Sequence, residues 1–542
     1  MKELTRRGFV VAASLAAVGG TVRTAAGHER SRPRDRSPVF RHGVASGDPL
    51  HDRAILWTRV TPKRVHDDVL VRWQVARDPR MKKRVCGGSA WTDASRDFTV
   101  KIDARDLEPD RTYYYRFETS GARSPIGRTR TLPLFAARRL RFAVASCANY
   151  PYGYFNVYRR IAERADLDFV VHLGDYIYEY ANGQYGDGTA TGRIPAPDRE
   201  MVSLGDYRLR HATYKTDPDL QEAHRQHPFI AVWDDHESTN DSWQGGAQNH
   251  NPEAGEGDWE DRKRASIRAY FEWMPIREPQ RRSSGVIHRS FRVGNLAEID
   301  MLDTRLYGRD QQASGPGDTA TLIDPTRQLL GVEQETWLFN RLYHSHAQGV
   351  RWRVLGQQVM MAQLSADRGA SPINVDQWDG YAPARARLFE HLIDHDIRNT
   401  VVLTGDIHSS WGNDLTTNPY DSTVYDPITG RGSRGVELVT PAVTSPGIEP
   451  PAEAAQTAAL LRAVNPHMKY VELNKRGYVV VDIDRDRVHS EWYHVETIAD
   501  RDNTQTLAAA LRSESMSDHL VPAQQFAPLG EAAELAPDSE TG

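Results

Sequence analysis

The sequence has only two cysteines in 542 residues, no excess of basic charge and no apolar run long enough to cross a membrane. Two cysteines cannot form a disulfide-rich scaffold, although Cys86 and Cys147 could pair with each other in an exported protein. A membrane-spanning helix needs about 20 apolar residues, which the apolar run at residues 9–18 does not reach. The formal net charge of −5 argues against a general nucleic-acid-binding protein.

The remaining composition is typical of a large folded protein. Hydrophobic residues make up 39% and charged residues 26% of the sequence, and 12 Trp with 22 Tyr argue against disorder. The length is sufficient for two or three domains with at least one large core.

The N-terminus has the pattern of an export signal. Arg6 and Arg7 form a twin-arginine pair, which an apolar run and small residues up to Ala26 follow. We therefore expect residues 1–26 to be a Tat signal, read by the Tat export machinery, and the protein to be secreted, periplasmic or cell-wall associated. The alternative is a basic N-terminus that precedes a short helix. Because the Tat route carries folded proteins, often with a metal already loaded, the signal also suggests a cofactor.

Residues 38–133 are expected to form a small antiparallel β-sandwich of the fibronectin or immunoglobulin type. Strand-like runs are separated by turns with no helix between them, at residues 54–60, 69–75, 98–102 and 112–117. The segment 107–115 resembles the turn into a fibronectin-type strand, where a tyrosine ties the corner together. We expect this domain to serve packing or docking rather than catalysis.

Strands and helices alternate over residues 139–500, which predicts an α/β layered catalytic domain. Helices are expected at residues 156–164, 262–273, 334–344 and 384–396, and strands at 289–293, 296–300, 353–361 and 436–439. Two strands within residues 478–495 would close the domain. Residues 501–542 are expected to form a tail with a short helix at residues 507–511 and a disordered end.

Four apolar runs in this domain end in side chains that can bind metals. The residues that follow them are Cys147, then Asp175 and Tyr178, then Asp234 to Glu237, and finally Asp406 and His408. Open α/β sheets bind ligands at the carboxyl ends of their strands, so we expect these side chains to form one composite metal site.

Each motif also has a structural interpretation. Asp175 could form a turn or cap a helix, residues 234–237 could be a solvated strand end, and Asp406 with His408 could be a structural pair. Cys86 lies in a loop-like segment, which favours a thiolate ligand at Cys147 over a disulfide. The four motifs together, in one alternating domain, favour the metal site.

The four motifs resemble those of the calcineurin-like binuclear metallophosphatases, although each departs from the superfamily pattern. They read Ser146-Cys147-Ala148-Asn149, Gly174-Asp175-x-x-Tyr178, Asp234-Asp235-His236-Glu237 and Gly405-Asp406-Ile407-His408. Together the departures look like the PhoD-type alkaline phosphatases, and residues 40–49 and 57–59 resemble the N-terminal signature of that family. The resemblance implies a metallophosphatase-like α/β layered sandwich.

The resemblance also implies two kinds of metal. Ferric iron (Fe3+) would be held by Cys147, Asp175, Tyr178 and His408. Calcium (Ca2+) would be held by the oxygen ligands Asp175, Asp235 and Asp406. A thiolate and a phenolate favour a redox-capable transition ion, whereas Ca2+ prefers hard oxygen ligands. Asp235 stands where the wider superfamily has Asn.

Four further residues have expected roles toward the phosphate. His236 resembles the superfamily histidine that stabilises the transition state or helps the leaving group. Asn149 could contact phosphate, and so could Arg210 and Lys215, although a helix surface explains the last two equally well. The long loops at residues 181–206 and 244–258 are expected to form lids or substrate walls.

The expected activity is hydrolysis of phosphate monoesters or diesters by in-line attack of a metal-activated water, with Asp175 and His236 at the catalytic centre. The core motifs do not separate this from a phospholipase D-like phosphodiesterase. A different alternative is a non-catalytic exported protein that binds metal and phosphate. We expect a monomer with a phosphoester substrate and no nucleic-acid-binding module.

Overall fold

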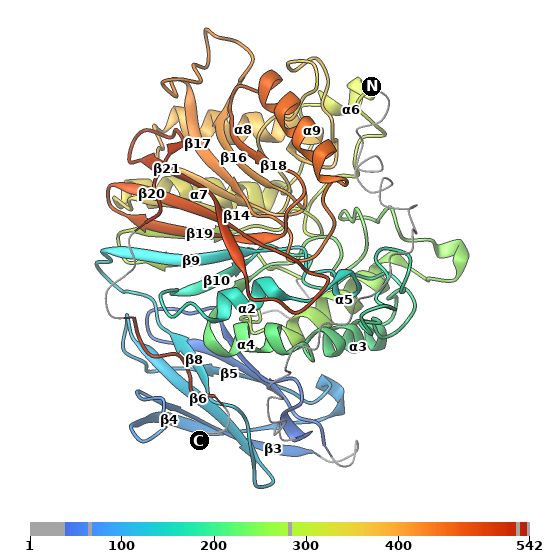
Figure 1. Ribbon diagram of the computed structural model, residues 1–542, viewed down its shortest axis with the longest axis vertical. Helices are drawn as coiled ribbons and strands as arrows, with labels where there is room; N and C mark the ends of the chain where they lie inside the picture. Colours follow the sequence, from blue (N-terminus) through green and yellow to red (C-terminus); the bar gives the residue numbers. More distant parts are fainter. Residues whose placement is uncertain (1–37, 63–67, 280–284, 527–531, 539–542) are drawn as a thin grey trace, which may run out of the picture.

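Two large β-sheets form the centre of the computed structural model, which describes residues 38–62, 68–279, 285–526 and 532–538 (Figure 1). The expected export signal, residues 1–26, lies outside the described residues. Both sheets contribute to one hydrophobic core, with Val144 and Val171 from the first sheet and Val354 and Val401 from the second.

The first sheet has ten strands. In spatial order they are β22 (Val521–Pro522), β21 (Gln505–Glu514), β20 (Arg487–Val495), β19 (Gly477–Asp484), β9 (Arg139–Ala145), β10 (Phe169–His172), β11 (Pro228–Ala231), β1 (Val44–Gly47), β2 (Ala54–Arg59) and β5 (Thr99–Ala104). β9, β10 and β11 are adjacent and parallel, so their carboxyl ends meet at one edge of the sheet. The hairpin of β19 and β20 confirms the predicted closing pair of strands.

The second sheet has seven strands. In spatial order they are β12 (Arg289–Val293), β13 (Ala297–Met301), β14 (Trp352–Gly356), β15 (Thr400–Thr404), β17 (Ser433–Val439), β16 (Ser410–Thr416) and β18 (Met468–Glu472). The four from β13 to β17 are parallel. A single bridge between Ser146 and Ala442 joins the carboxyl ends of β9 and β17, and so connects the two sheets.

Helices cover both sheets, which confirms the layered α/β sandwich. The first sheet carries α2 (Asn156–Ala162), α3 (Leu204–Tyr214), α4 (Pro218–Gln226) and α5 (Trp259–Trp273). The second carries α7 (Val332–Ala347), α8 (Ala382–Asp394) and α9 (Pro451–Val464), and the short α6 (Thr319–Leu322) precedes α7. Among the described residues no helix is long and apolar enough to span a bilayer.

Neither α4 nor α9 was predicted from the sequence, and α3 was considered only as one explanation of Arg210 and Lys215. The buried faces of α3 and α4 carry polar residues, including Arg210 and His211 in α3 and His224 and Arg225 in α4, so no apolar stripe marks them. The N-terminal ends of both helices nevertheless carry ordinary capping residues. Ser203 and Asp206 form a capping box at α3, and Asp217 caps α4. The loop expected to reach residue 206 therefore ends at Ser203.

The N-terminal sandwich shares one of its layers with the ten-stranded sheet. Its separate layer is an antiparallel sheet made of β4 (Arg84–Thr92), β3 (Val69–Ala76), β6 (Thr112–Thr119), β7 (Ala122–Arg123) and β8 (Gly127–Arg130). The facing layer is β1, β2 and β5, which continue the ten-stranded sheet through the parallel pairing of β1 with β11. The predicted tyrosine corner is present, since the backbone N–H of Glu108 donates to Tyr113 Oη at 2.9 Å.

The two cysteines do not pair. Cys86 lies within β4 rather than in the predicted loop, whereas Cys147 is buried after β9, and both thiols are free.

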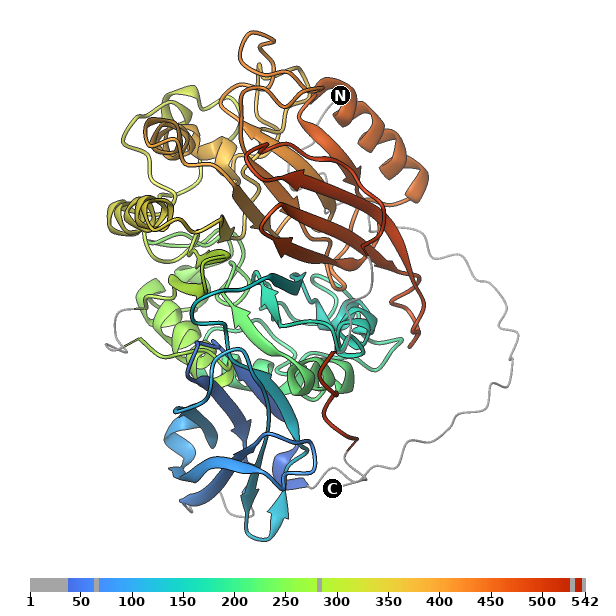
Figure 2. The same ribbon diagram turned by 90° about the vertical axis from the view of Figure 1, so that its left-hand side faces the viewer.

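The C-terminal segment differs from its prediction in two places. Residues 507–511 belong to β21, not to a helix, because pairing with β20 overrides the helical preference of the alanines. Residues 532–538, expected to be disordered, lie against the N-terminal sheet (Figure 2). Tyr114 Oη donates to Glu534 O at 2.6 Å, the Gln226 amide bonds both the N–H and the carbonyl of Ala536, and Ala536 is buried.

A buried histidine makes the stability of this fold depend on pH. His227, directly after α4, is buried with Nε2 at 3.0 Å from Ile161 O. Burial, with the nearby charge of Arg128, lowers the pKa of His227 to about 3. The unfolded chain therefore binds more protons below about pH 6.5, the ordinary histidine pKa. The stabilisation is complete above that pH and is lost as the pH falls toward 3.

Between pH 7 and pH 5, we expect the free energy of unfolding of wild type to fall by about 2 kcal/mol more than that of His227→Gln, because the glutamine does not titrate. Urea unfolding at the two pH values measures the difference. His51→Gln, which removes a half-exposed imidazole, is the control. Equal losses in wild type and His227→Gln would contradict the assignment.

Candidate metal centre

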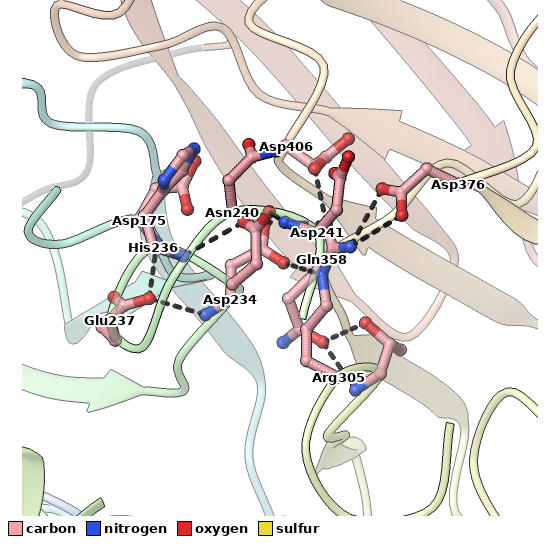
Figure 3. A network of polar contacts seen from close by, with 12 residues as sticks. Asp175, Asp234, His236, Glu237, Asn240, Asp241, Arg305, Gln358, Asp376 and Asp406 are labelled. Carbon is pink, nitrogen blue, oxygen red and sulfur yellow. Dashed lines mark hydrogen bonds and ion pairs between the residues drawn. The ribbon is translucent and has the colours of Figure 1, made fainter. Parts of the chain in front are cut away.

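The predicted strand ends meet in one cluster. Its ligand atoms form three groups, within each of which they lie no more than 4.8 Å apart. The groups are Cys147 with Asp175 and His408, Asp175 with Asp235 and His236, and Asp234 with Asp235 and Asp406. Asp175 belongs to the first two groups and Asp235 to the last two. The cluster is therefore continuous, with the Cys147 thiol and the His408 imidazole in the first group. Figure 3 shows the carboxylates of Asp175, Asp234 and Asp406.

The backbone at these strand ends is unusual. Cys147, Asp175, Asp406 and His408 have φ values of 62°, 53°, 58° and 57°, in the left-handed region that side chains disfavour. Such strain persists at functional sites when the surrounding structure enforces it. Gly174 shows the crowding directly, because a Cβ there would lie 2.3 Å from the backbone nitrogen of Asp234. The ends of β10 and β11 can approach this closely only with glycine at residue 174.

The first side of the cluster offers mixed donor atoms. Tyr178 Oη donates to Asp175 Oδ2 at 2.8 Å and lies 3.3 Å from His408 Nε2, while Ser445 Oγ donates to Tyr178 Oη at 2.6 Å. Burial and the negative charge of Asp175 raise the pKa values of Cys147 and Tyr178 well above their ordinary range. A bound cation would favour their charged forms. Sulfur, phenol, imidazole and carboxylate donors fit a transition ion.

Apart from the His236 imidazole, the second side offers oxygen donors. Asp175 Oδ1 and Asp234 Oδ2 are buried and have no hydrogen-bond partner among the described residues. A buried carboxylate oxygen without a partner is costly, so each is placed to accept a hydrogen bond or a metal. Asp235 accepts from the backbone N–H groups of His236 and Asp241, at 3.1 and 2.7 Å. The oxygen donors fit a hard cation such as Ca2+.

Glu237 holds the two strand ends together. Its carboxylate accepts hydrogen bonds from the backbone N–H groups of Asp175, Tyr176 and Asp234, at 3.1, 2.6 and 2.8 Å. Because the first two follow β10 and the third follows β11, this carboxylate fixes the spacing between the two ligand-bearing segments. It positions candidate ligands from both strands (Figure 3).

His236 is oriented by an acid that the sequence analysis did not identify. Its Nδ1 lies 2.7 Å from Glu179 Oε2, and Glu179 also accepts from the Asn240 N–H at 2.8 Å. Burial alone would lower the pKa of His236, but the carboxylates of Glu179, Asp235 and Asp175 raise it well above its usual value. Glu179 directly follows Tyr178, and only its long-range contact identifies its role.

Two other residues outside the sequence prediction lie beside the cluster. Arg305, in the loop after β13, donates to Asp234 and, at 2.7 Å, to Asp406. Tyr185, in the long loop after β10, stacks at 6.2 Å on the His236 ring and at 6.5 Å on the His408 ring. His408 keeps 12% of its side chain exposed, so the cluster reaches the surface on this side.

The predicted phosphate contacts have different outcomes. Asn149 is buried beside Cys147, with its amide N–H donating to Tyr185 O at 3.0 Å and its Oδ1 unpartnered among the described residues. Arg210 was predicted to contact phosphate, and the structure contradicts this. Its buried guanidinium donates to the carbonyls of Tyr178, Ala196, Pro197 and Arg199, so it supports the loop.

Lys215 likewise does not face the cluster. Its amine is buried and donates to Tyr176 Oη at 2.8 Å.

The comparisons with known proteins agree with the geometry. The family model described as PhoD-like phosphatase matches residues 142–492, and the model of the PhoD-like phosphatase N-terminal domain matches residues 24–133. Alkaline phosphatase D of Bacillus subtilis (strain 168) is 39% identical over 463 residues, which cover 82% of this chain and 76% of that protein. A solved structure described as the structure of PhoD superposes with a TM-score of 0.81 at 34% identity, over 92% of this chain and 95% of that one.

We expect Glu179→Gln to lower kcat for a nitrophenyl phosphate roughly 10- to 100-fold, because the neutral amide removes the negative charge that orients the His236 ring and favours its protonated form. In a His236→Ala background the same substitution should cost nothing further, since the two residues act as a unit. Glu200→Gln removes a carboxylate that pairs with Arg262 and serves as the control. Additive losses in the double variant would show that Glu179 acts independently of His236.

Proposed function

Because this chain belongs to the PhoD-like phosphatase family and is therefore a metal-dependent phosphoester hydrolase, we propose that it binds Fe3+ beside Ca2+ and cleaves phosphate monoesters and diesters. The observation that carries the proposal is the position of Asp175. Its Oδ2 accepts from Tyr178 on the mixed-donor side, while its Oδ1 has no partner among the described residues. One carboxylate is thus shared between two unlike sets of donors.

On the mixed-donor side, Cys147, Asp175, Tyr178 and His408 would hold the Fe3+. The close contacts among Asp175, Tyr178 and His408 support this assignment, as does the buried thiol beside them. Thiolate and phenolate ligands are unusual for Ca2+ or Mg2+ and are typical of transition ions.

On the oxygen side, Asp175, Asp235 and Asp406 would hold the Ca2+. Asp234 also lies in this group, and its Oδ1 accepts from Arg305 while its Oδ2 has no partner among the described residues. When bound, the two cations supply charge that neutralises phosphate oxygens and lowers the pKa of an attacking water.

The side chains of the protein would orient the substrate and move the proton. His236, with Nδ1 held by Glu179, is placed to donate a proton from its other nitrogen to the leaving-group oxygen. Asn149, whose buried amide N–H donates to Tyr185 O, would bind a phosphate oxygen. Tyr185 would cover the reacting phosphate against the two histidines and reduce its contact with water.

We also propose that residues 1–26 direct export through the Tat machinery, that the mature protein is secreted, periplasmic or cell-wall associated, and that it is a monomer. The twin-arginine pair supports the export proposal. The balance between monoesters and diesters, including phospholipase D-like substrates, depends on the loop that carries Tyr185 and on residues 244–258.

We expect the purified protein to be coloured, with a broad visible band from charge transfer between Tyr178 and Fe3+. Tyr178→Phe should lose most of the band and keep its Ca2+, because the phenol lies on the mixed-donor side only. Absorption spectra with metal analysis of both proteins measure this. A colourless, iron-free and fully active wild type would overturn the iron assignment.

We expect Asp175→Asn to lower kcat by roughly 10³-fold or more while the circular dichroism stays unchanged, because both cations lose their shared ligand. Mono- and diester nitrophenyl phosphates and phosphatidylcholine are the substrates to compare. Asp198→Asn, at an exposed carboxylate of the neighbouring loop, is the control. Near-normal turnover in Asp175→Asn would mean that the bridging role is wrong.

A further inference from the structure

Arg305 is a fully buried arginine among the carboxylates of the oxygen side (Figure 3). Its Nε donates to Asp234 Oδ1 and its Nη2 to Asp406 Oδ1 at 2.7 Å. Its Nη1 contacts both oxygens of Asp376, at 3.0 and 2.9 Å. Asp235 Oδ1 lies 3.8 Å from Nη2. The guanidinium therefore contacts ligand-bearing residues that follow both β11 and β15.

The guanidinium is itself held in place. The backbone N–H of Arg305 donates to Asp303 Oδ1 at 2.8 Å, and Asp303 Oδ2 accepts from the Trp233 indole at 3.0 Å. Asp376, the third carboxylate on the guanidinium, also accepts from Arg309 Nη2 at 2.6 Å. A guanidinium anchored on two sides cannot follow a moving carboxylate, so it fixes the position of each carboxylate that it contacts.

This contact has two opposing effects on a cation at the oxygen side. The permanent positive charge of Arg305 repels a cation and would weaken its binding. The hydrogen bonds hold Asp234 and Asp406 together against their mutual repulsion and would strengthen it. Asp376 offsets much of the charge, because it contacts the guanidinium through both of its oxygens. The hydrogen bonds therefore dominate.

We propose that Arg305 is the positioning residue of the oxygen side, which sets Asp234 and Asp406 in place before Ca2+ binds and thereby raises the affinity for this ion. The inference rests on the proposed Ca2+ site. Arg305 acts through the carboxylates, since all three of its nitrogens already donate to Asp234, Asp376 and Asp406.

The test is a Ca2+ titration by calorimetry on full-length protein from which Ca2+ has been removed with a chelator. Arg305→Lys keeps the charge and loses the planar fork, and Arg305→Gln loses both. We expect the dissociation constant to rise roughly 10- to 100-fold in both, as for other residues that orient metal ligands. Iron content should stay unchanged, and excess Ca2+ should restore much of the turnover of Arg305→Lys.

Arg141→Lys is the matched control. Arg141 is also buried and shared between carboxylates, Asp482 at 2.7 Å and Asp166 at 2.6 Å, but it lies in the first half of β9, away from the cluster. Its substitution should leave the Ca2+ affinity unchanged. A loss equal to that of Arg305→Lys would reduce the role of Arg305 to general stability and overturn the inference.

The other outcomes are also decisive. Unchanged affinity in both Arg305 variants would overturn the inference, and so would tighter binding in Arg305→Gln, which would show that repulsion dominates. If Arg305→Gln does not fold, Asp376→Asn removes one anchor of the guanidinium and should weaken Ca2+ binding by a smaller factor; no change would count against the proposal. Failure of wild type to bind Ca2+ would instead overturn the proposed function.

Discussion

Mutual repulsion among buried acidic groups is the constraint around which this structure is built. Four carboxylates, of Asp175, Asp234, Asp235 and Asp406, converge with the thiol of Cys147 where the two sheets meet. Burying an uncompensated charge costs roughly several kcal/mol. These groups lie at the carboxyl ends of strands, and several of the same residues also have a left-handed backbone conformation, which is itself unfavourable. Such an arrangement is stable when cations share the charge, which is consistent with the metal dependence of the family.

The sequence predicted the parts of the site that follow from local patterns. Each ligand-bearing segment is a short apolar run followed directly by polar residues, and parallel pairing brings the ends of β9, β10 and β11 together. The layered fold follows from the alternation of strands and helices. The bounds of α3 and the whole of α4 were not predicted because their buried faces are polar. Residues 507–511 of β21 were assigned as a helix because the pairing with β20 is not a local property.

The residues that orient the ligands could not be predicted in this way. Arg305 is 71 residues from Asp234 and 101 from Asp406 in the sequence, and it follows a strand with no distinctive motif. Glu179 is 57 residues from His236. Arg210 is the opposite case. Its charge suggested a phosphate contact, but the buried guanidinium donates to backbone carbonyls instead. Long-range contacts decide such roles, and a single sequence does not show them.

The C-terminal segment has a consequence for how the chain acquires its structure. Residues 38–133 are synthesised before β11 and residues 532–538, and domains generally fold in the order of synthesis. Here Ala536 packs with Ala76 of β3 and Tyr114 of β6, and β1 of the facing layer pairs with β11. The N-terminal sandwich therefore reaches its final packing only after residues 228–231 and 536, far along the chain, have been synthesised.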